Sequence, residues 1–392
     1  MAVENKFTSV VLIVGAGPAG LATSACLNLL SIPNIILERE DCYASLWKKR
    51  AYDRLKLHLA KGFCELPHMP YPPKTPCFVP RSGFISYLDK YVSKFDISPL
   101  YYRFVESAKY EEESENWCVR VKNLSLDVQE IYYAKFLVVA SGENSEGFIP
   151  QVSGLDSFRG EFIHSNKFVS GKDFSGKDVL VVGCGNSGME IAYDLSNWGA
   201  NTSIVARSPV HILTKEMVFL GMLLLNFLPY RIVDFISIML SKLRFGDISK
   251  HGLQRPVEGP FYLKARTGRS PTIDVGTMDK IKKGEIRVLP SIATIQENKI
   301  KFANGLMDHF DVIVFATGYK STVRNWLEDG NDLFNENGMP KRNFPNHRKG
   351  ENGLYCAGFA SRGLAGISID AQNIAKDISQ ALDQKQVDKR KF

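Results

Sequence analysis

Two glycine-rich segments with identical spacing are the residues of this chain most suited to binding a reactive cofactor. Both read Gly-x-Gly-x-x-Gly: Gly15, Gly17, Pro18, Ala19 and Gly20 in the first, and Gly183, Gly185, Asn186, Ser187 and Gly188 in the second. The first glycine of such a motif permits a tight turn, the second lets the main chain approach a pyrophosphate, and the third allows close packing of helix on strand. The pattern predicts two dinucleotide-binding turns, each with a pyrophosphate at the positive end of a helix.

The charges that follow the two motifs differ. Glu38 lies 18 residues after Gly20, and a carboxylate there can accept hydrogen bonds from ribose hydroxyls. The same offset from Gly188 reaches Ala206, which is followed by Arg207, and a guanidinium can bind a 2′-phosphate. We therefore predict FAD at the first motif, with Glu38 and its neighbour Arg39, and NADPH rather than NADH at the second.

The elements that must position these motifs are buried parallel strands followed by helices. Each motif follows a continuous apolar run and precedes a segment with helical spacing, which is the context that the motif requires. Further strands are expected at 34–37, 136–140, 202–205 and 312–316, a small antiparallel excursion between 105 and 133, and a closing helix at 370–382. The predicted fold is α/β, with two Rossmann-like dinucleotide-binding domains and the NADPH domain inserted into the FAD domain. The predicted boundaries are 1–168 and 312–392 for FAD and 169–311 for NADPH.

Composition excludes several other classes of protein. The 392 residues include 49 Lys plus Arg and 42 Asp plus Glu, and the net charge of +7 is scattered rather than gathered in a patch, so no nucleic-acid partner is expected. Seven cysteines without a CxxC pair argue against a disulfide scaffold, a zinc site and a dithiol redox centre. No metal-ligand cluster is visible, and reduced thiols in the cytoplasm are the expectation.

One apolar segment, 217–240, bears on membranes. It is interrupted by Asn226, Pro229, Arg231 and Asp234, so it offers no clean span of ~20 apolar residues. We expect a buried helix pair or a lid there and no transmembrane span. A shallow interfacial helix is the alternative, and it would give peripheral contact with the surface of the endoplasmic reticulum. The polar first residues indicate no secretory signal, and the sequence sets no oligomeric state.

Two nucleotide sites imply hydride transfer from NADPH to a flavin, which must then pass its electrons on. Disulfide substrates would need a dithiol, which the sequence lacks. Molecular oxygen is the leading remaining acceptor, so the residues favour a monooxygenase.

Two further motifs carry a resemblance to a known family. The segment 158–168, FRGEFIHSNKF, resembles the FxGxxxHxxx(Y/F) signature of flavin-containing monooxygenases, and Phe315–Tyr319 resembles their ATG-type motif. Finer matches resemble the plant YUCCA branch, and they lie in family order along nearly the whole chain. The matching segments are Trp47 with 52–58, 63–67, 142–144, 187–190, 259–260, 274–277, 358–359, 362–364 and Gly366.

The resemblance implies oxidative decarboxylation of indole-3-pyruvate, a 2-oxo acid, to the auxin indole-3-acetate, with FAD, NADPH and O2 and through a C4a-peroxyflavin. It implies Asn144 and His58 as catalytic candidates, His58 standing where sulfur- and nitrogen-oxidising members have Asn. It also implies Trp47, Gly318 and Gly358 as FAD-binding candidates. The alternatives are an N- or S-oxygenating flavin monooxygenase, a non-catalytic NADPH/FAD sensor, and a leaky NADPH oxidase.

Overall fold

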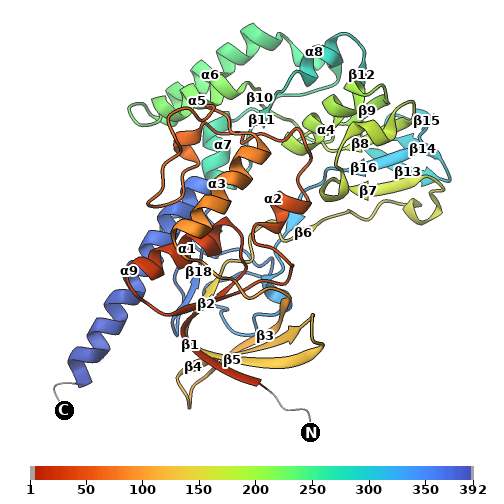
Figure 1. Cartoon of the computed structure of the whole chain (residues 1–392). Coiled ribbons are helices and arrows are strands. Elements are labelled where there is room, and N and C mark those ends of the chain that lie inside the picture. The colour runs from red at the N-terminus through yellow and green to blue at the C-terminus, as the bar shows by residue number, and fades with distance from the viewer. Residues whose placement is uncertain (1–4, 390–392) are drawn as a thin grey trace. The chain divides into compact units, whose positions relative to one another are not determined.

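The computed structural model describes residues 5–389, which divide into two compact units (Figure 1). Unit 1 is built from three segments: residues up to Lys49, Ala60–Glu146, and residues from Tyr319 onward. Unit 2 is built from Arg50–Leu59 and Gly147–Gly318. An insertion of one α/β unit into another is therefore present, and the α/β fold class is confirmed by the parallel sheets.

The predicted boundaries at 168/169 and 311/312 are displaced from those of the structure. β7 (Glu161–His164) and β16 (Val312–Phe315) pair with each other, and β16 also pairs with β8 (Asp178–Val182), all in parallel. These strands therefore belong to the sheet of unit 2. From its apolar residues alone, the run 312–316 is predicted to be a strand of the outer domain. The sequence of one segment does not show which other strands it pairs with.

Unit 1 is a mixed six-stranded sheet with helices packed on it. Its strands are β2 (Asn34–Leu37), β1 (Asn5–Val14), β5 (Val128–Val139), β4 (Asn116–Asn123) and β3 (Arg103–Glu111) in that order, with β18 (Leu354–Cys356) also paired to β5. β3, β4 and β5 are antiparallel, which confirms the predicted excursion, whereas β2, β1, β5 and β18 run parallel. Its helices are α1 (Pro18–Leu29), α2 (Ser45–Lys49), α3 (Arg81–Lys94) and α9 (Gly363–Lys389), and α9 packs against α1.

Unit 2 has a five-stranded parallel sheet. Its strand order is β12 (Ile286–Leu289), β9 (Asn201–Val205), β8, β16 and β7. Two smaller sheets of unit 2 contain β10 (Ile212–Leu213) with β11 (Thr272–Ile273), and the antiparallel β13 (Ile292–Gln296), β14 (Lys299–Phe302) and β15 (Met307–His309), while the short strands β6 (Glu146–Gly147) and β17 (Tyr319–Lys320) pair at the junction of the chain segments. Its helices are α4 (Asn186–Asn197), α5 (Lys215–Leu224), α6 (Tyr230–Phe245), α7 (Pro260–Thr267) and α8 (Thr277–Lys282).

Both sheets are built around strongly apolar, buried strands. Val11, Leu12 and Ile13 of β1 are fully buried, as are Val179, Leu180 and Val181 of β8, which is the pattern of parallel strands covered on both faces. Each unit has its own core, so each can hold a rigid strand-turn-helix motif at the carboxyl edge of its sheet.

Candidate dinucleotide-binding sites

The four parallel strands of unit 1 end at one level. The last residues of β1, β2, β5 and β18 are in register, so the residues that follow them are neighbours along the carboxyl edge of the sheet. Those residues are Gly15, Glu38, Ala140 and Ala357. Ligands of open α/β sheets bind at such an edge.

The first glycine motif has the shape of a pyrophosphate cradle. Gly15 has φ +107°, and a Cβ there would lie 2.6 Å from the carbonyl oxygen of Ala140, while a Cβ on Gly20 would collide with the carbonyl oxygen of Gly15. A Cβ on Gly17, in contrast, would meet nothing within 4 Å. Gly17 is the N-cap of α1, Pro18 begins the helix, and no described side chain caps it. The first and third glycines are therefore needed for the fold, and the second leaves the helix N-terminus open to a ligand.

Glu38 folds back onto this turn. Its Oε2 accepts a hydrogen bond from the Ala16 amide at 2.8 Å, and its Oε1 accepts one from the Glu40 amide at 3.0 Å. The side chain is buried, and burial raises the pKa of its carboxyl group. Arg39 points to solvent, where its Nε lies 3.8 Å from a Glu40 oxygen. The carboxylate predicted to bind ribose thus lies beside the glycine turn.

A second turn of unit 1 approaches the same helix. Gly358 has φ +82°, and a Cβ there would lie 2.9 Å from the Cβ of Ala19. The Gly358 amide donates to Asp370 Oδ2 at 3.0 Å, and Asp370 Oδ1 lies 3.0 Å from Nε2 of His347. Both of these side chains are 1% exposed. A fully buried polar pair, Asp370 on α9 and His347 in the loop before β18, therefore fixes the turn that touches the first motif, and sequence reasoning missed both of its members.

The predicted residues Asn144 and Trp47 also lie in unit 1. Asn144 is exposed and follows Glu143, whose Oε2 accepts a hydrogen bond from Ser361 at 3.3 Å, so the turns after β5 and β18 are joined. The Trp47 ring packs edge-to-face on Phe84 with centroids 4.6 Å apart. Direct contact of either side chain with a cofactor stays a prediction.

The glycine motif of unit 2 has the same local geometry as that of unit 1. The last residues of β8, β9, β16 and β7 are in register, and a Cβ on Gly183 (φ +113°) would lie 2.5 Å from the carbonyl oxygen of Ala316. A Cβ on Gly188 would collide with the Gly183 carbonyl, whereas one on Gly185, the N-cap of α4, would meet nothing within 4 Å. Ala316, in the ATG-type motif, therefore packs against this second fingerprint. The first two residues of α4 are Asn186, whose Oδ1 accepts from the Ile273 amide at 2.7 Å, and Ser187.

The charged residues near the second glycine motif are cations, whereas the carboxylate of Glu38 lies beside the first. Ala206 follows β9, and the next residue, Arg207, has an exposed side chain. A second cation, Arg269, donates from Nη2 to the Pro209 carbonyl at 2.5 Å. Because Pro209 comes two residues after Arg207, the Arg269 guanidinium lies close to the loop that follows β9. Sequence reasoning missed Arg269 because no pattern links it to a motif so far away in the chain.

His58 is placed in unit 2, against α4. Its Nε2 lies 3.3 Å from Oε1 of Glu190, whose side chain is 3% exposed, while that of His58 is 27% exposed. Burial is the largest single influence and raises the pKa of Glu190, but the hydrogen bonds with His58 and Tyr52 and the charges of His58 and Lys215 together leave the pKa below its ordinary value. Glu190 comes two residues after the last glycine of the motif, so the fingerprint helix fixes the imidazole.

Gly318 closes unit 2. Its carbonyl oxygen lies 2.9 Å from Nε2 of His164 and accepts from the Phe148 amide at 2.9 Å. The glycine thereby fixes the end of the inserted unit, and its predicted contact with FAD stays a prediction.

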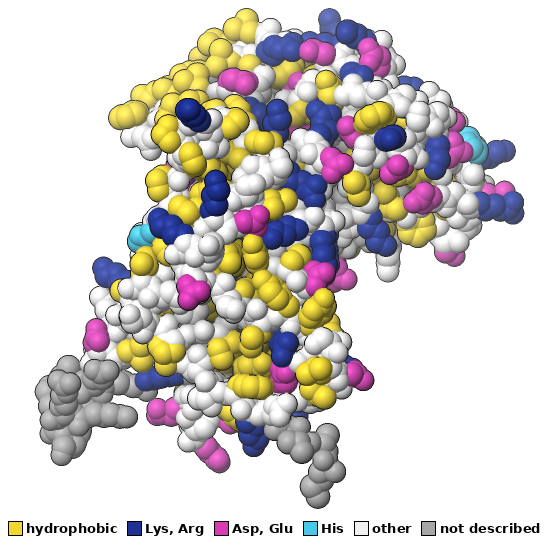
Figure 2. Space-filling view, in the orientation of Figure 1, with side chains coloured by type: hydrophobic (Ala, Val, Ile, Leu, Met, Phe, Trp, Pro, Cys, Tyr) yellow, Lys and Arg dark blue, Asp and Glu magenta, His cyan; other side chains and the backbone are white. Residues whose placement is uncertain are grey.

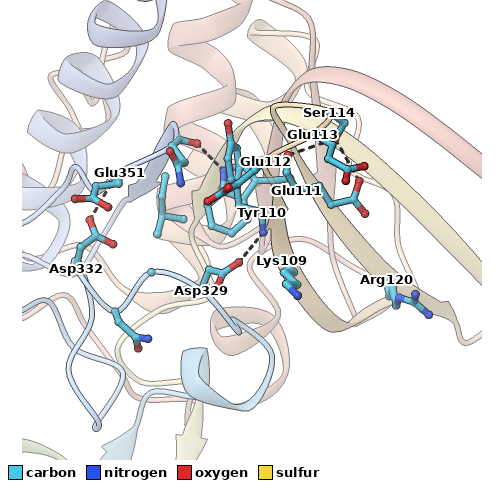
Figure 3. A pocket seen from close by; sticks show the side chains of 15 residues that line it. Lys109, Tyr110, Glu111, Glu112, Glu113, Ser114, Arg120, Asp329, Asp332 and Glu351 are labelled. Carbon is cyan, nitrogen blue, oxygen red and sulfur yellow. Dashed lines mark hydrogen bonds between the residues drawn. The ribbon is translucent and has the colours of Figure 1, made fainter.

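A separate surface pocket of unit 1 does not suit a phosphate. It lies between the β3–β4 hairpin and the loops around 329–332 and 351–354 (Figure 3). Six carboxylates line it: Glu111, Glu112, Glu113, Asp329, Asp332 and Glu351. Asp329 and Asp332 accept hydrogen bonds from backbone amides, at 2.8 and 2.7 Å, which gives them structural roles. This pocket is therefore a poor candidate for a dinucleotide, and the glycine turns stay the predicted sites.

Solved structures with low sequence identity share this fold. A flavin-containing monooxygenase from Stenotrophomonas maltophilia matches with a TM-score of 0.71 at 19% identity, covering 96% of this chain and 99% of that one. Cyclohexanone monooxygenase from Rhodococcus sp. Phi1 bound to NADP+ matches with a TM-score of 0.74 at 15% identity, covering 97% and 85%.

Curated relatives are much more similar in sequence. The probable indole-3-pyruvate monooxygenase YUCCA10 of Arabidopsis thaliana is 54% identical over 375 residues, which cover 95% of this chain and 98% of the relative. The indole-3-pyruvate monooxygenase YUCCA4 of Oryza sativa subsp. japonica is 44% identical, covering 94% and 87%. The model of the flavin-binding monooxygenase-like family matches residues 8–362. With these identities and a family-model match over most of its length, this chain belongs to the flavin-binding monooxygenase-like family.

Proposed function

We propose that this protein is an FAD-dependent monooxygenase that converts indole-3-pyruvate, O2, NADPH and a proton into indole-3-acetate, CO2, NADP+ and water. The observation that carries the proposal is a pair of open glycine cradles, one in each unit, with Glu38 beside the first and Arg207 and Arg269 near the second. The names of the similar plant proteins support indole-3-pyruvate as the substrate.

Unit 1 fits FAD. The uncapped N-terminus of α1 at Gly17 would hold the pyrophosphate, and Glu38 would accept the ribose hydroxyls. The turn at Gly358, which begins the approach to α9, would present backbone amides to the flavin ring. FAD, when bound, supplies the redox chemistry, taking hydride from NADPH and activating O2.

Unit 2 fits NADPH. The uncapped N-terminus of α4 at Gly185 would hold its pyrophosphate, and the absence of an acid at Ala206 removes repulsion from a 2′-phosphate. Arg207 and Arg269 would neutralise that phosphate.

His58 and Asn144 are the proposed polar groups of the reaction. Glu190 holds Nε2 of His58, which leaves Nδ1 as the nitrogen that can exchange a proton with a reactant. Asn144, on the turn after β5, would orient NADP+ or oxygen with its amide. Excluding water is the remaining task of the chain, because water diverts activated oxygen to hydrogen peroxide.

We also propose that the enzyme works in the cytoplasm and contacts the surface of the endoplasmic reticulum peripherally. Seven free thiols, five of them buried, suit a reducing compartment. None of the helices among residues 5–389 is long and apolar enough to cross a bilayer.

The decisive experiment uses purified protein with FAD, NADPH, O2 and a panel of 2-oxo acids, amines and sulfides. We expect NADPH consumption, indole-3-acetate and CO2 in equal amounts with indole-3-pyruvate. Oxides of amines or sulfides would support an oxygenase of the other type. Hydrogen peroxide equal to the NADPH consumed would indicate an oxidase, and NADPH binding without oxygen uptake would indicate a sensor. Any of these three outcomes overturns the proposal.

The choice of NADPH over NADH has its own test. Replacing Arg207→Ala removes a charged hydrogen-bond donor, which we expect to raise KM for NADPH by roughly 10- to 100-fold and to leave KM for NADH almost unchanged. The matched control is Arg159→Ala, which removes an exposed cation of unit 2 that pairs with Glu297. An unchanged NADPH preference would show that Arg207 does not bind the 2′-phosphate.

A further inference from the structure

Helix α6 is oriented with its apolar side toward solvent. Ile232, Phe235, Met239 and Leu243 follow one another at spacings of three and four residues, and they are 45, 68, 44 and 76% exposed. This spacing places them on one helical face. The expectation that segment 217–240 forms a buried helix pair is therefore wrong: it forms a helix pair, but its apolar residues are largely outside.

The opposite face of α6 holds the helix in place with polar contacts. Ser237 donates to the Val233 carbonyl within α6, whereas Ser241 donates to the Ile212 carbonyl of β10 and so ties the helix to another element of unit 2, both at 2.8 Å. Asp234 accepts from the amides of Phe261 and Tyr262, at 2.7 and 3.1 Å, which ties α6 to the first turn of α7. Because these buried polar groups are satisfied, the exposed apolar face is the stable arrangement of this helix and not a misplaced core.

The apolar face continues over α5 and the turn between the helices. We name it the hairpin face, and its members are Phe219, Leu220, Leu223, Phe227, Tyr230, Ile232, Phe235, Met239 and Leu243, all at least 36% exposed. Figure 2 shows it as a continuous apolar area over α5 and α6. A contiguous exposed apolar area of this size indicates a surface that contacts a membrane or another protein.

The charged residues near the hairpin face indicate what kind of partner covers it. Arg231 and Lys242 of α6 are exposed and directly adjacent in sequence to Ile232 and Leu243. Residues 230–269 hold eight Lys or Arg, of which Arg244 and Arg266 pair with Asp279 and Glu258, and three Asp or Glu, one of them the buried Asp234. An apolar helix face flanked by an excess of cations is the signature of a helix that lies in the headgroup region of an anionic bilayer. Two copies of this face would bring like charges together, which disfavours a second copy of the chain as the occupant.

We propose that the hairpin face of unit 2 inserts into the headgroup region of an anionic membrane, with α5 and α6 lying in the plane of its surface. The inference names the surface for the peripheral contact proposed above and is independent of the reaction. Phe227 and Leu243, at the two ends of the face, are its most exposed members and would insert at opposite ends of the contact.

The test is flotation of the FAD-loaded protein with vesicles of phosphatidylcholine, with and without phosphatidylserine. We expect binding to the vesicles that contain phosphatidylserine, weakened by salt, and a partition coefficient at least about tenfold lower for the variant Phe235→Ser with Leu243→Ser. A second variant, Arg231→Glu with Lys242→Glu, should lose the preference for phosphatidylserine. The matched control is Leu126→Ser, which removes an apolar side chain of unit 1 that is 67% exposed.

Failure of this proposal is distinguishable from failure of the proposed function, because turnover is measured separately without vesicles and should be equal in all four proteins. Equal flotation of the Ser variant and wild type would overturn the proposal, as would absence of flotation by wild type at low salt. A dimer in light scattering that the Ser variant abolishes, without vesicle binding, would assign the face to a second copy instead.

Discussion

At the scale of single residues, the middle glycine of each motif can be substituted to test cofactor binding without disturbing the fold. Gly17 and Gly185 have φ of −71° and −76°, which any residue can adopt, and their added Cβ atoms would meet open space. We expect Gly17→Val to fold and to lose FAD, because its side chain fills the cradle. Gly185→Val should keep its yellow colour and lose NADPH binding. Visible absorbance and NADPH titration measure the two effects.

Gly15→Val is the contrasting control, because its positive φ and the Ala140 carbonyl forbid a side chain on structural grounds. This variant should lower the free energy of unfolding as well as FAD binding. A Gly17→Val protein that retains stoichiometric FAD would contradict the assignment of the first site.

The carboxyl group of Glu190 provides a pH-dependent prediction. Its pKa is lowered in the folded protein from an ordinary value of 4.5, so its stabilising contribution is present above that value and is lost as pH falls through the lowered one. We expect Glu190→Gln to lower the free energy of unfolding by about 1–3 kcal/mol at neutral pH. The difference should shrink in acid. Urea unfolding across a pH series measures it, with the exposed Glu216→Gln as control; a difference independent of pH would refute the role of the charge.

At the scale of elements, helix α9 does more than close unit 1. Its Asp370 joins the Gly358 turn to His347. Asp370→Asn removes the carboxylate from a buried polar cluster, which should cost about 1–3 kcal/mol of stability and loosen the turn that touches α1. We expect FAD to dissociate at least about tenfold faster. The control is Asp377→Asn on the same helix, where the partly exposed carboxylate pairs with Arg348; equal FAD release from both variants would contradict a specific role for Asp370.

The secondary-structure elements also show most clearly how much of the fold could be predicted from the sequence. Strand-glycine-helix units are local, so the pattern predicted β1 with α1, β8 with α4, and the different charges after β2 and β9. Strand pairing and burial are not local. The pattern therefore misassigned 312–316 to the outer domain, expected 217–240 to be buried, and gave no sign of the His347–Asp370 pair.

At the scale of the whole molecule, the chain passes between the units four times, yet each unit keeps its own core. The core of unit 1 is drawn from strands such as β1 and β5, and that of unit 2 from β8, β9 and α4. A ligand stabilises the part of a protein that it contacts, by about 2.7 kcal/mol at a concentration 100 times its Kd. Each cofactor should therefore protect one sheet more than the other.

Hydrogen exchange of the FAD-loaded protein with and without NADP+ tests this division. We expect NADP+ to slow exchange of amides in α4 and in the loop after β9, because these groups border the second cradle, and to leave the strands of the first sheet unchanged. Gly185→Val supplies the control, since it removes the NADP+ site without altering α1. Protection that spread evenly over both sheets would mean that the two units respond as one body, and the assignment of one nucleotide to each unit would then lose its thermodynamic support.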